Sequence, residues 1–509
     1  MNQDEALLTQ LGYKQDLRRA FSRVELFGLS FSIIGVFPSI AGVLIYAVPY
    51  GGPVAMIWGT GKWTVCSFFL MSIACAIAEF GSAAPTAGGL YYWTFHYASP
   101  RWRNLLSWVV GYTNTIAYAV GVTSVDWACA VSLLAGASIG SDLNYEPTTA
   151  HTFGVFAALV LCHIMITSLS TFALARLQGL YITLNILLFL DQWLCVYSEF
   201  PLTALDRRCV APAHFDQSVI GHPTDCPSGG FDSSVHISEE ASNASYAVPF
   251  ATISSPLVAV ILGWGINVAI AFCMGTDLES IVANPINQPL ATIFFNSFGK
   301  KGTLAVWSIV VVVQFIMGAS ILTASSRQMW AFSRDGALPF SKFLYRLNSR
   351  THTPVYSVCA AGSIAILVGV LVFAGPVATS AIFSAAVVGQ YVGLSIPILC
   401  RLFGGREWVP GVFSLGKFGV PVSVVAVLWM IFGTVVLSFP NDPGPTPQDM
   451  NYTALVIGGW IFLCLAYYFF PVYGGMYWFK GPVSNLKATV EDSSSSVNVE
   501  EKEISVRTK

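Results

Sequence analysis

The chain has 509 residues, of which 54% are hydrophobic and only 10% are charged, and its formal net charge is -2. A soluble domain carries roughly 25% charged residues, so this chain has too little charge to cover several globular surfaces. The composition therefore excludes soluble enzymes, nucleic-acid binders and secreted disulfide scaffolds, and it predicts an all-α polytopic membrane protein.

The two ends of the chain differ from the rest. Residues 1–25 hold eight charged residues and no apolar run, which predicts a cytosolic N-terminal tail without a cleaved signal peptide. Residues 481–509, which include EDSSSS, are polar and predict a disordered cytosolic C-terminal tail. The membrane domain is therefore expected within residues 26–480.

Long apolar runs fill the region between the tails. A bilayer core requires about 20 mostly apolar residues in each crossing helix. These are unbroken runs and not the short alternating segments of a membrane β-barrel. We predict eleven spans, at 26–47, 54–77, 106–130, 152–173, 177–197, 250–273, 303–324, 355–374, 378–399, 418–438 and 453–471.

The first predicted span contains SIIGVFPSIAG, in which Gly35, Pro38 and Gly42 interrupt the helix pattern at membrane depth. Proline removes a backbone donor and clashes with the preceding turn. Unwound backbone is tolerated in a bilayer where protein or a water-filled cavity surrounds it, as at transporter midplane sites. The segment predicts either a broken helix at a binding site or a simple proline kink.

Two ionisable residues lie within later spans. Asp126 in the third span is an anion that suits a substrate ammonium group or a coupled proton, and ionisable residues inside spans are functional candidates by default. Its position toward the outer end of the helix also allows simple contact with water. His163 in the fourth span could relay protons or could be hydrogen-bonded structure.

Lys and Arg in the short loops set the orientation, because they stay on the cytosolic side. Their distribution predicts that both tails are cytosolic and that Lys300 and Lys301 lie outside. Five crossings from a cytosolic N-terminus leave the chain outside, whereas the run near Pro249 must start inside. Either a span is missing between residues 190 and 248, or the fifth run, which contains Asp191, does not cross.

Several motifs then occur in order, namely GVFPSIAG, PTAGGLYYW, HISEEASNASYAVP, GTDLESIVANPINQPLATIFFNSFGKKG and SSRQMWAFSRDGALP. Together they resemble the fungal GABA and choline permease branch of the amino acid, polyamine and organocation transporters. The resemblance extends over about residues 25–480. It implies a LeuT-like permease fold of twelve helices, with two inverted five-helix repeats and with the first and sixth helices broken at the substrate site.

The resemblance also implies site residues. The break after Gly35 maps onto Pro38, Ser39, Ile40, Ala41 and Gly42, whose freed amides would receive a substrate carboxylate at a helix dipole end. Asp126 would lie near the substrate amine. Ser320 and Thr323 resemble hydroxyl positions that bind the ion in sodium-coupled relatives, but proton coupling, which this branch implies, would leave them to bond helix backbone.

The resemblance stops after LNILLFL and resumes near GFDSSVHISEEASNA. Residues 191–229 between these motifs hold three Cys and four Pro and have no family character. We interpret this as a missing sixth span, and our hypothesis is that the stretch derives from a shifted reading frame or mis-splicing. About eleven helices are then recognisable, with the sixth disrupted.

The sequence thus predicts a secondary active transporter, and not an enzyme, that imports a small amino acid or amine such as GABA by proton-coupled alternating access. Choline or a polyamine is the alternative substrate, and a non-transporting nutrient receptor or a defective truncated permease is the alternative function. A proton gradient would drive transport without a cofactor or metal. The expected partners are the small substrate and the lipid bilayer, with no nucleic acid, in the plasma membrane or alternatively the vacuolar membrane.

Overall fold

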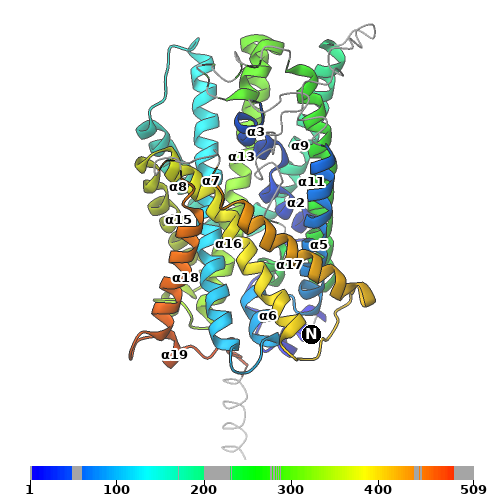
Figure 1. Cartoon of the computed structure of the whole chain (residues 1–509), viewed down its shortest axis with the longest axis vertical. Coiled ribbons are helices and arrows are strands. Elements are labelled where there is room, and N and C mark those ends of the chain that lie inside the picture. Colours follow the sequence, from blue (N-terminus) through cyan, green and yellow to red (C-terminus); the bar gives the residue numbers. More distant parts are fainter. Residues whose placement is uncertain are drawn as a thin grey trace, which may run out of the picture.

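The computed structural model describes residues 3–48, 60–169, 171–199, 230, 232–274, 288–440 and 450–486, together with residues 278, 281, 284, 286 and 446. Every regular element in this part of the chain is a helix, and most of the long helices run along one axis (Figure 1). The α-helices are α1 Gln3–Gln10, α2 Arg23–Ile34, α3 Val36–Ala47, α5 Thr60–Ala83, α6 Gly89–Tyr97, α7 Arg103–Gly140, α8 Thr149–Leu169, α9 Thr171–Glu199, α10 Ser233–His236, α11 Ala244–Cys273, α13 Pro289–Arg334, α14 Ser341–Leu344, α15 Val355–Gly369, α16 Pro376–Phe403, α17 Gly419–Val436, α18 Thr453–Phe469 and α19 Gly475–Trp478.

Ten stretches among the described residues are helical, long and apolar enough to cross a bilayer, and α18 is a shorter apolar helix. They match the eleven predicted runs one for one. Large apolar side chains, such as Leu428, Phe432 and Phe462, lie exposed on the outward faces of α17 and α18, where lipid would cover them. The all-α polytopic prediction is confirmed.

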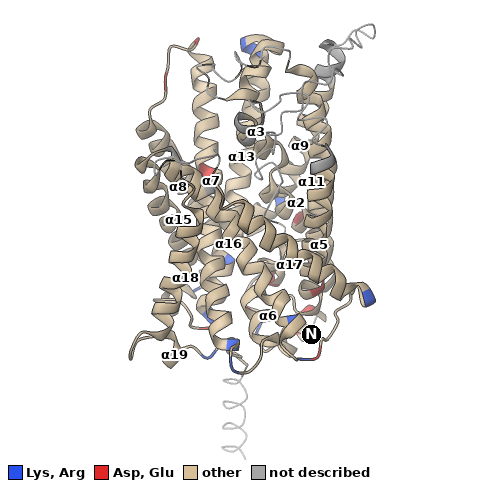
Figure 2. Cartoon of the chain, viewed as in Figure 1, with Lys and Arg blue, Asp and Glu red and all other residues tan. Residues whose placement is uncertain are grey.

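The orientation also agrees with the sequence. Lys and Arg lie mostly around the end of the molecule that holds the N-terminus, as Figure 2 shows. Lys300 lies at the opposite end, where its ammonium group is 2.6 Å from the Asp142 carboxylate. Because basic residues tend to stay in the cytosol, the N-terminal end is the expected inner side, and it is called the cytosolic end below.

The first crossing is two helices and not one. Ser22 begins α2 with a capping box, in which its hydroxyl accepts from the Glu25 amide and the Glu25 carboxylate accepts from the Ser22 amide. The helix ends at Gly35, whose φ of 55° and ψ of 60° lie in the left-handed region. Glycine reaches this region without steric cost, so α3 starts on a new axis directly afterwards.

The chain between α9 and α11, where the sequence left a span unplaced, is described only near its second end. Helix α9 extends to Glu199 and is long enough to cross completely, so the fifth run does span. Residue 230 and residues 232–240 are then buried in the inner half of the molecule, and they lead through the short helix α10 to the start of α11. Most of the anomalous stretch 191–229 lies outside the described residues, apart from the end of α9.

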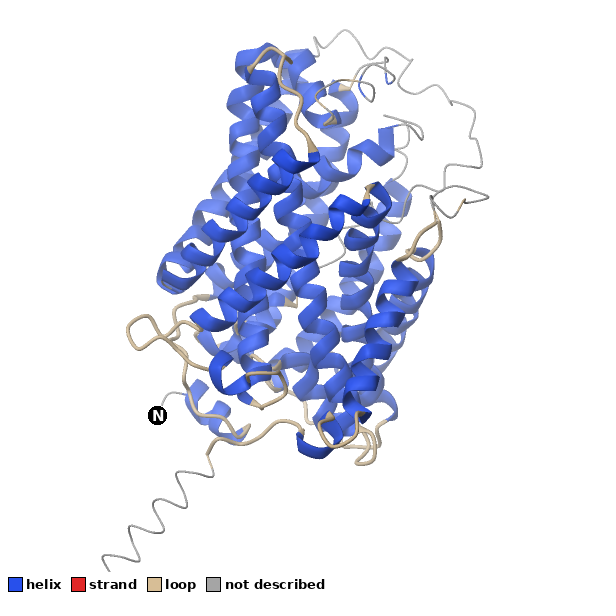
Figure 3. Ribbon diagram, turned by 90° about the vertical axis from the view of Figure 1, so that its left-hand side faces the viewer, coloured by secondary structure: helices blue, strands red, loops and turns tan. Residues whose placement is uncertain are grey.

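The core forms around α7 and α13, which pack along each other, while α16 packs on α7 and α11 packs on α5 and α2. Figure 3 shows the long helices side by side in the perpendicular view. Helix α13 is longer than the predicted run 303–324, since it includes a kink at Gly299 and extends to Arg334 at the inner end. This helix therefore reaches from the outer surface to the cytosolic face.

Both terminal segments pack against the cytosolic face. Residues 3–22, predicted as part of a tail, contain α1 and bury Tyr13 and Phe21. Residues 481–486 lie beside them, where the Ser484 hydroxyl donates to the Gly12 carbonyl at 2.9 Å. Residues 487–509 lie outside the described residues.

Candidate functional site

The break between α2 and α3 lies within the first apolar span, and it leaves the start of α3 without a continuous helical turn before it. The first N–H groups of an α-helix have no carbonyl partner within that helix. In α3 these donors are the amides of Val36 and Phe37, since Pro38 has no N–H. The positive end of the helix dipole points the same way and favours an anion. This arrangement can hold a carboxylate.

The position of the break corrects the sequence interpretation. The break is at Gly35 and not over Pro38–Gly42, because these residues form the first turns of α3. The Ser39 amide already donates to the Gly35 carbonyl at 2.8 Å, and its hydroxyl donates to the Ile34 carbonyl at 2.9 Å. Proline is tolerated in a first turn, where its missing N–H has no partner in any case, so Pro38 does not break this helix.

The inner half of the sixth crossing lies against the last turns of α2. A Cβ atom added at Gly230 would lie 3.0 Å from Cβ of Ile33, and the Ser233 hydroxyl is 3.2 Å from the Ser30 hydroxyl. Gly230 and Ser233 therefore lie beside the last turns of α2. The described residues just before α11 thus lie beside α2.

Asp232 in this segment is a buried carboxylate without a hydrogen bond. Its side chain is 1% exposed, and neither oxygen has a hydrogen-bond partner among the described residues. The Tyr118 hydroxyl of α7 is also fully buried and is the neighbour of Asp232 on that helix. The two groups do not meet the distance and angle of a regular hydrogen bond. An unpaired carboxylate in such a place is costly, so it indicates a site for a positively charged partner.

His236 does not supply that charge. Its Nδ1 lies 3.0 Å from the Ala87 carbonyl and so carries the hydrogen, while Nε2 lies 3.1 Å from the Asn114 amide nitrogen and accepts from it. The ring is therefore neutral, and its Nε2 remains 3.9 Å from Asp232. Asp232 is left as a net negative charge in a segment that contacts α2 at Ser30 and Ile33.

Asp126 has a different environment from the one expected. It is fully buried on α7 and does not reach water, and its Oδ2 lies 3.1 Å from Nδ1 of His163 on α8. The structure thus joins two residues that the sequence considered separately. Neither Oδ1 of Asp126 nor Nε2 of His163 has a hydrogen-bond partner within the described parts of the chain.

The two hydroxyls proposed for ion coupling bond helix backbone. Ser320 donates to the Ile316 carbonyl at 2.9 Å, and Thr323 donates to the Ala319 carbonyl at 2.7 Å. The Gln178 amide of α9 also donates to the Ser320 hydroxyl at 3.0 Å. A metal ion at Ser320 would have to displace this amide nitrogen, which is a donor and not a ligand.

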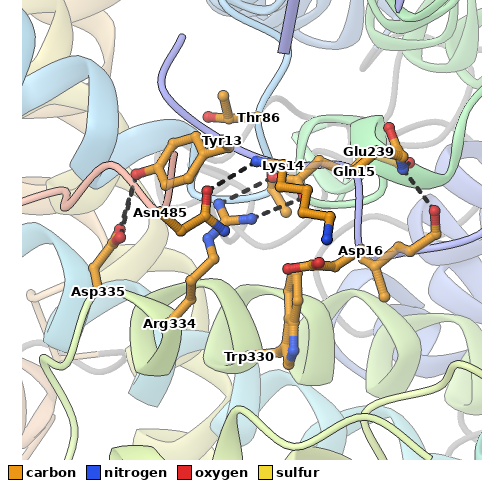
Figure 4. Close-up of polar contacts among 12 residues, drawn as sticks. Tyr13, Lys14, Gln15, Asp16, Thr86, Glu239, Trp330, Arg334, Asp335 and Asn485 are labelled. Carbon is orange, nitrogen blue, oxygen red and sulfur yellow. Dashed lines mark hydrogen bonds and ion pairs between the residues drawn. The ribbon is translucent and has the colours of Figure 1, made fainter. Parts of the chain in front are cut away.

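A second polar cluster closes the cytosolic end, as Figure 4 shows. Arg334 at the end of α13 binds both oxygens of Glu239, at 2.9 and 3.0 Å, and the Arg334 guanidinium lies 3.8 Å from the centre of the Tyr13 ring. Arg327 pairs with Glu240 at 2.7 Å. All four charged side chains are buried, so the end of the sixth crossing is held to α13 by two ion pairs.

The terminal segments complete this cluster. Asp335 accepts hydrogen bonds from Tyr91 at 2.7 Å and from Tyr13 at 3.1 Å, and it also accepts one from the Val483 amide. The Asn485 side chain accepts from the Lys14 amide at 2.8 Å. Burial raises the pKa of Asp335 to about 6, although the Arg334 charge acts in the opposite direction. Both terminal segments therefore contact the cytosolic end of α13.

Sequence reasoning missed Asp232, Tyr118 and Gln178. Asp232 follows the stretch without family character, so no predicted span contained it. Tyr118 and Gln178 are ordinary residues within apolar runs. The only sequence signal was that Asp232 lies in GFDSSVH, where the resemblance resumes.

The chain is similar to amino acid permeases over most of its length. The family model for amino acid permeases matches residues 21–191 and 227–462. Residues 192–226 between these two parts fall outside the match, within the stretch where the sequence departs from its resemblance.

Curated relatives agree with the family model. A GABA-specific permease of Saccharomyces cerevisiae is 37% identical over 499 residues, which is 95% of this chain and 86% of that protein. An uncharacterized amino-acid permease of Schizosaccharomyces pombe is 33% identical over 96% of this chain and 89% of that protein. An amino-acid permease of Arabidopsis thaliana is 31% identical over 96% of this chain and 97% of that protein.

Proposed function

Because the chain belongs to the amino acid permease family, a family of transporters and not of enzymes, we propose that it imports a small amino acid, with GABA as the leading candidate. A proton gradient would drive the import by alternating access. The GABA-specific relative supports this choice of substrate, and choline or a polyamine is the alternative. The plasma membrane is the proposed location, with the vacuolar membrane as the alternative.

One observation carries this proposal: a helix N-terminus and an unpaired buried carboxylate lie beside the same turns of α2. The amides of Val36 and Phe37 suit a carboxylate, and Asp232 suits an ammonium group. A zwitterion with its charges at opposite ends of a short chain fits such a pair. Choline or a polyamine would use Asp232 but would leave the start of α3 without an anion.

A substrate-binding role for Asp126 stays a prediction. It would require the carboxylate to leave His163 and turn toward the substrate. Asp232 needs a smaller rearrangement, since its neighbours are the Tyr118 hydroxyl and the neutral His236 ring. We therefore propose Asp232 as the main contact for the substrate amine.

Uptake of radiolabelled GABA into cells that lack their own permeases tests the function. We expect uptake by the full chain that is competed by unlabelled GABA more strongly than by choline. Asp232→Asn should raise KM at least about tenfold, since loss of one buried ion pair exceeds the roughly 1.4 kcal/mol that a factor of ten represents.

Asp191→Asn is the matched control, because Asp191 is also an acid within a crossing helix but lies on α9 and outside the proposed site. It should transport like the unaltered chain. Equal losses in both variants would contradict the role of Asp232. Signalling on GABA addition without uptake would favour the receptor alternative, and a silent but correctly inserted chain would favour the defective permease.

A further inference from the structure

We propose that Asp126 and His163 together form the binding site for the proton that drives transport. This inference rests on the proposed function and names the residues that would couple it to the proton gradient. Neither residue contacts α2 or α3 through any described polar interaction, so the pair is a site separate from Asp232 and the start of α3.

The pair has room for one more proton. When Asp126 is ionised it only accepts hydrogen bonds, so in that form Nδ1 of His163 carries the hydrogen and donates to Oδ2 of Asp126 over the 3.1 Å contact. In this form the imidazole is neutral and the pair carries one negative charge. Nε2 of His163 and Oδ1 of Asp126 have no hydrogen-bond partner among the described residues, so either atom can accept a proton.

Burial makes the net charge of the pair important. Both side chains are 0% exposed, and an isolated negative charge in such a place is unfavourable. Addition of one proton at Nε2 makes an imidazolium that neutralises the Asp126 carboxylate, and addition at Oδ1 makes a neutral acid beside a neutral ring. In both cases the net charge changes from -1 to zero, and loss of the same proton reverses the change.

The surroundings supply no competing charge near the pair. Phe315 of α13 covers the His163 ring, with the ring centres 4.4 Å apart. The Cys129 thiol on α7 is an ionisable neighbour of Asp126, and α7 also carries the buried Tyr118. Helix α8 carries Cys162, and α15 carries Tyr356 and Cys359, which are both exposed. The other Lys, Arg, Asp, Glu and His residues of α7, α8, α9, α13 and α16 lie farther toward the helix ends, namely Arg103, His151, Arg176, Asp191, Glu199, Lys300, Lys301, Arg327, Arg334 and Arg401.

Helix α13 joins the pair to the break in the first crossing. A Cβ atom at Gly318 would lie 2.5 Å from Cε1 of His163 and closer still to Oδ1 of Asp126, so α13 contacts the pair through its bare backbone. The adjacent residue, Met317, faces Gly35, where an added Cβ atom would lie 2.8 Å from the Met317 methyl group. One turn of α13 therefore contacts both the proposed proton site and the break.

This packing gives a physical route for coupling. A change in the charge or hydrogen bonding of Asp126 and His163 alters their packing against Gly318 of α13. A shift of α13 would in turn move Met317 relative to Gly35. The left-handed glycine is the point at which α2 and α3 can change their angle. Protonation of the pair can thus bias the helices that hold the substrate.

Purified protein in liposomes separates coupling from substrate binding. Two quantities are measured: accumulation of labelled GABA under an imposed inward proton gradient, and exchange of labelled for unlabelled GABA without a gradient. We expect His163→Gln and Asp126→Asn to lose at least about tenfold in proton-driven accumulation while exchange continues. Cys129→Ser, which changes a neighbouring thiol, is the control and should keep both activities.

A measurement on the unaltered protein covers the case in which a variant fails to fold. Infrared difference spectra between acidic and neutral pH should contain signals of the histidine ring or of a protonated carboxyl, and isotope labelling of histidine should shift the ring signals. Absence of any titration of the pair, or proton-driven accumulation that survives in a folded Asp126→Asn protein, would overturn the proposal. Loss of exchange together with accumulation in both variants would also overturn it, because the pair would then serve substrate binding or folding. Lack of all GABA transport in the unaltered protein would instead refute the proposed function, and the infrared titration would still decide the proton site.

Discussion

Replacement of Gly318 by alanine would test the packing at the centre of α13. The added Cβ atom would lie 2.5 Å from Cε1 of His163 and 3.0 Å from its Nδ1. Non-bonded carbon atoms stay about 3.5 Å or more apart, so the His163 ring must move by roughly 1 Å. The 3.1 Å bond between His163 and Asp126 would then be lost or strained.

The expected cost is about 3 kcal/mol. Overpacking of a core accounts for about 1 to 3 kcal/mol, and a buried charged group that loses its hydrogen bond accounts for a similar amount. We expect the melting temperature of the detergent-solubilised protein to fall by roughly 5 °C or more, as a fluorescence-based unfolding scan would measure.

Gly179→Ala provides the control, because Gly179 is also inside a long helix but an added Cβ atom there meets no atom within 4 Å. Its melting temperature should equal or exceed that of the unaltered protein, since alanine favours helix over glycine. If Gly318→Ala were as stable as Gly179→Ala, the close packing of α13 against Asp126 and His163 would be refuted.

Three further predictions concern the cytosolic end and the anomalous stretch. Glu239→Gln should destabilise the protein by about 3 to 5 kcal/mol in an unfolding scan, because it leaves the buried Arg334 charge unpaired, whereas Glu407→Gln at an exposed site should have no effect. Burial raises the pKa of Asp335 to about 6, so the docked termini bind a proton that the undocked state releases, and docking should weaken as pH rises from about 4 through 6. Spin labels at Gln10 and Lys480 should move apart over this pH range, and Asp335→Asn should abolish the change; a distance that is constant in the unaltered protein would contradict it. Translation of the genomic locus in three frames should yield an apolar run leading into Asp232, and its absence from every frame would end the hypothesis of a shifted reading frame.

The spans and their orientation could be predicted from the sequence. Hydrophobic runs of bilayer length and the position of Lys and Arg depend on the surrounding solvent, so they need no knowledge of packing. The helices α15, α16, α17 and α18 accordingly match the predicted runs to within a few residues, whereas α13 extends well beyond its predicted run at both ends. No span was predicted between α9 and α11, because no long apolar run occurs there.

The site could be predicted less well, because it depends on contacts between distant segments. Gly35 breaks the first helix where Met317 packs against it, whereas Pro38 looks like the stronger breaker in the sequence. Asp126 and His163 were each recognised as unusual, but their contact joins two helices. The tail around Tyr13 looks solvated by composition, and only the structure shows its ring beneath Arg334.

The central claim is that this permease binds an amine at Asp232 beside the broken first helix. Binding of labelled GABA to the purified full chain in detergent tests it most directly, with Asp232→Asn and Asp191→Asn measured in parallel. We expect saturable binding that choline displaces weakly, that Asp232→Asn reduces at least about tenfold, and that Asp191→Asn preserves. Undiminished binding of GABA to a folded Asp232→Asn protein would contradict it.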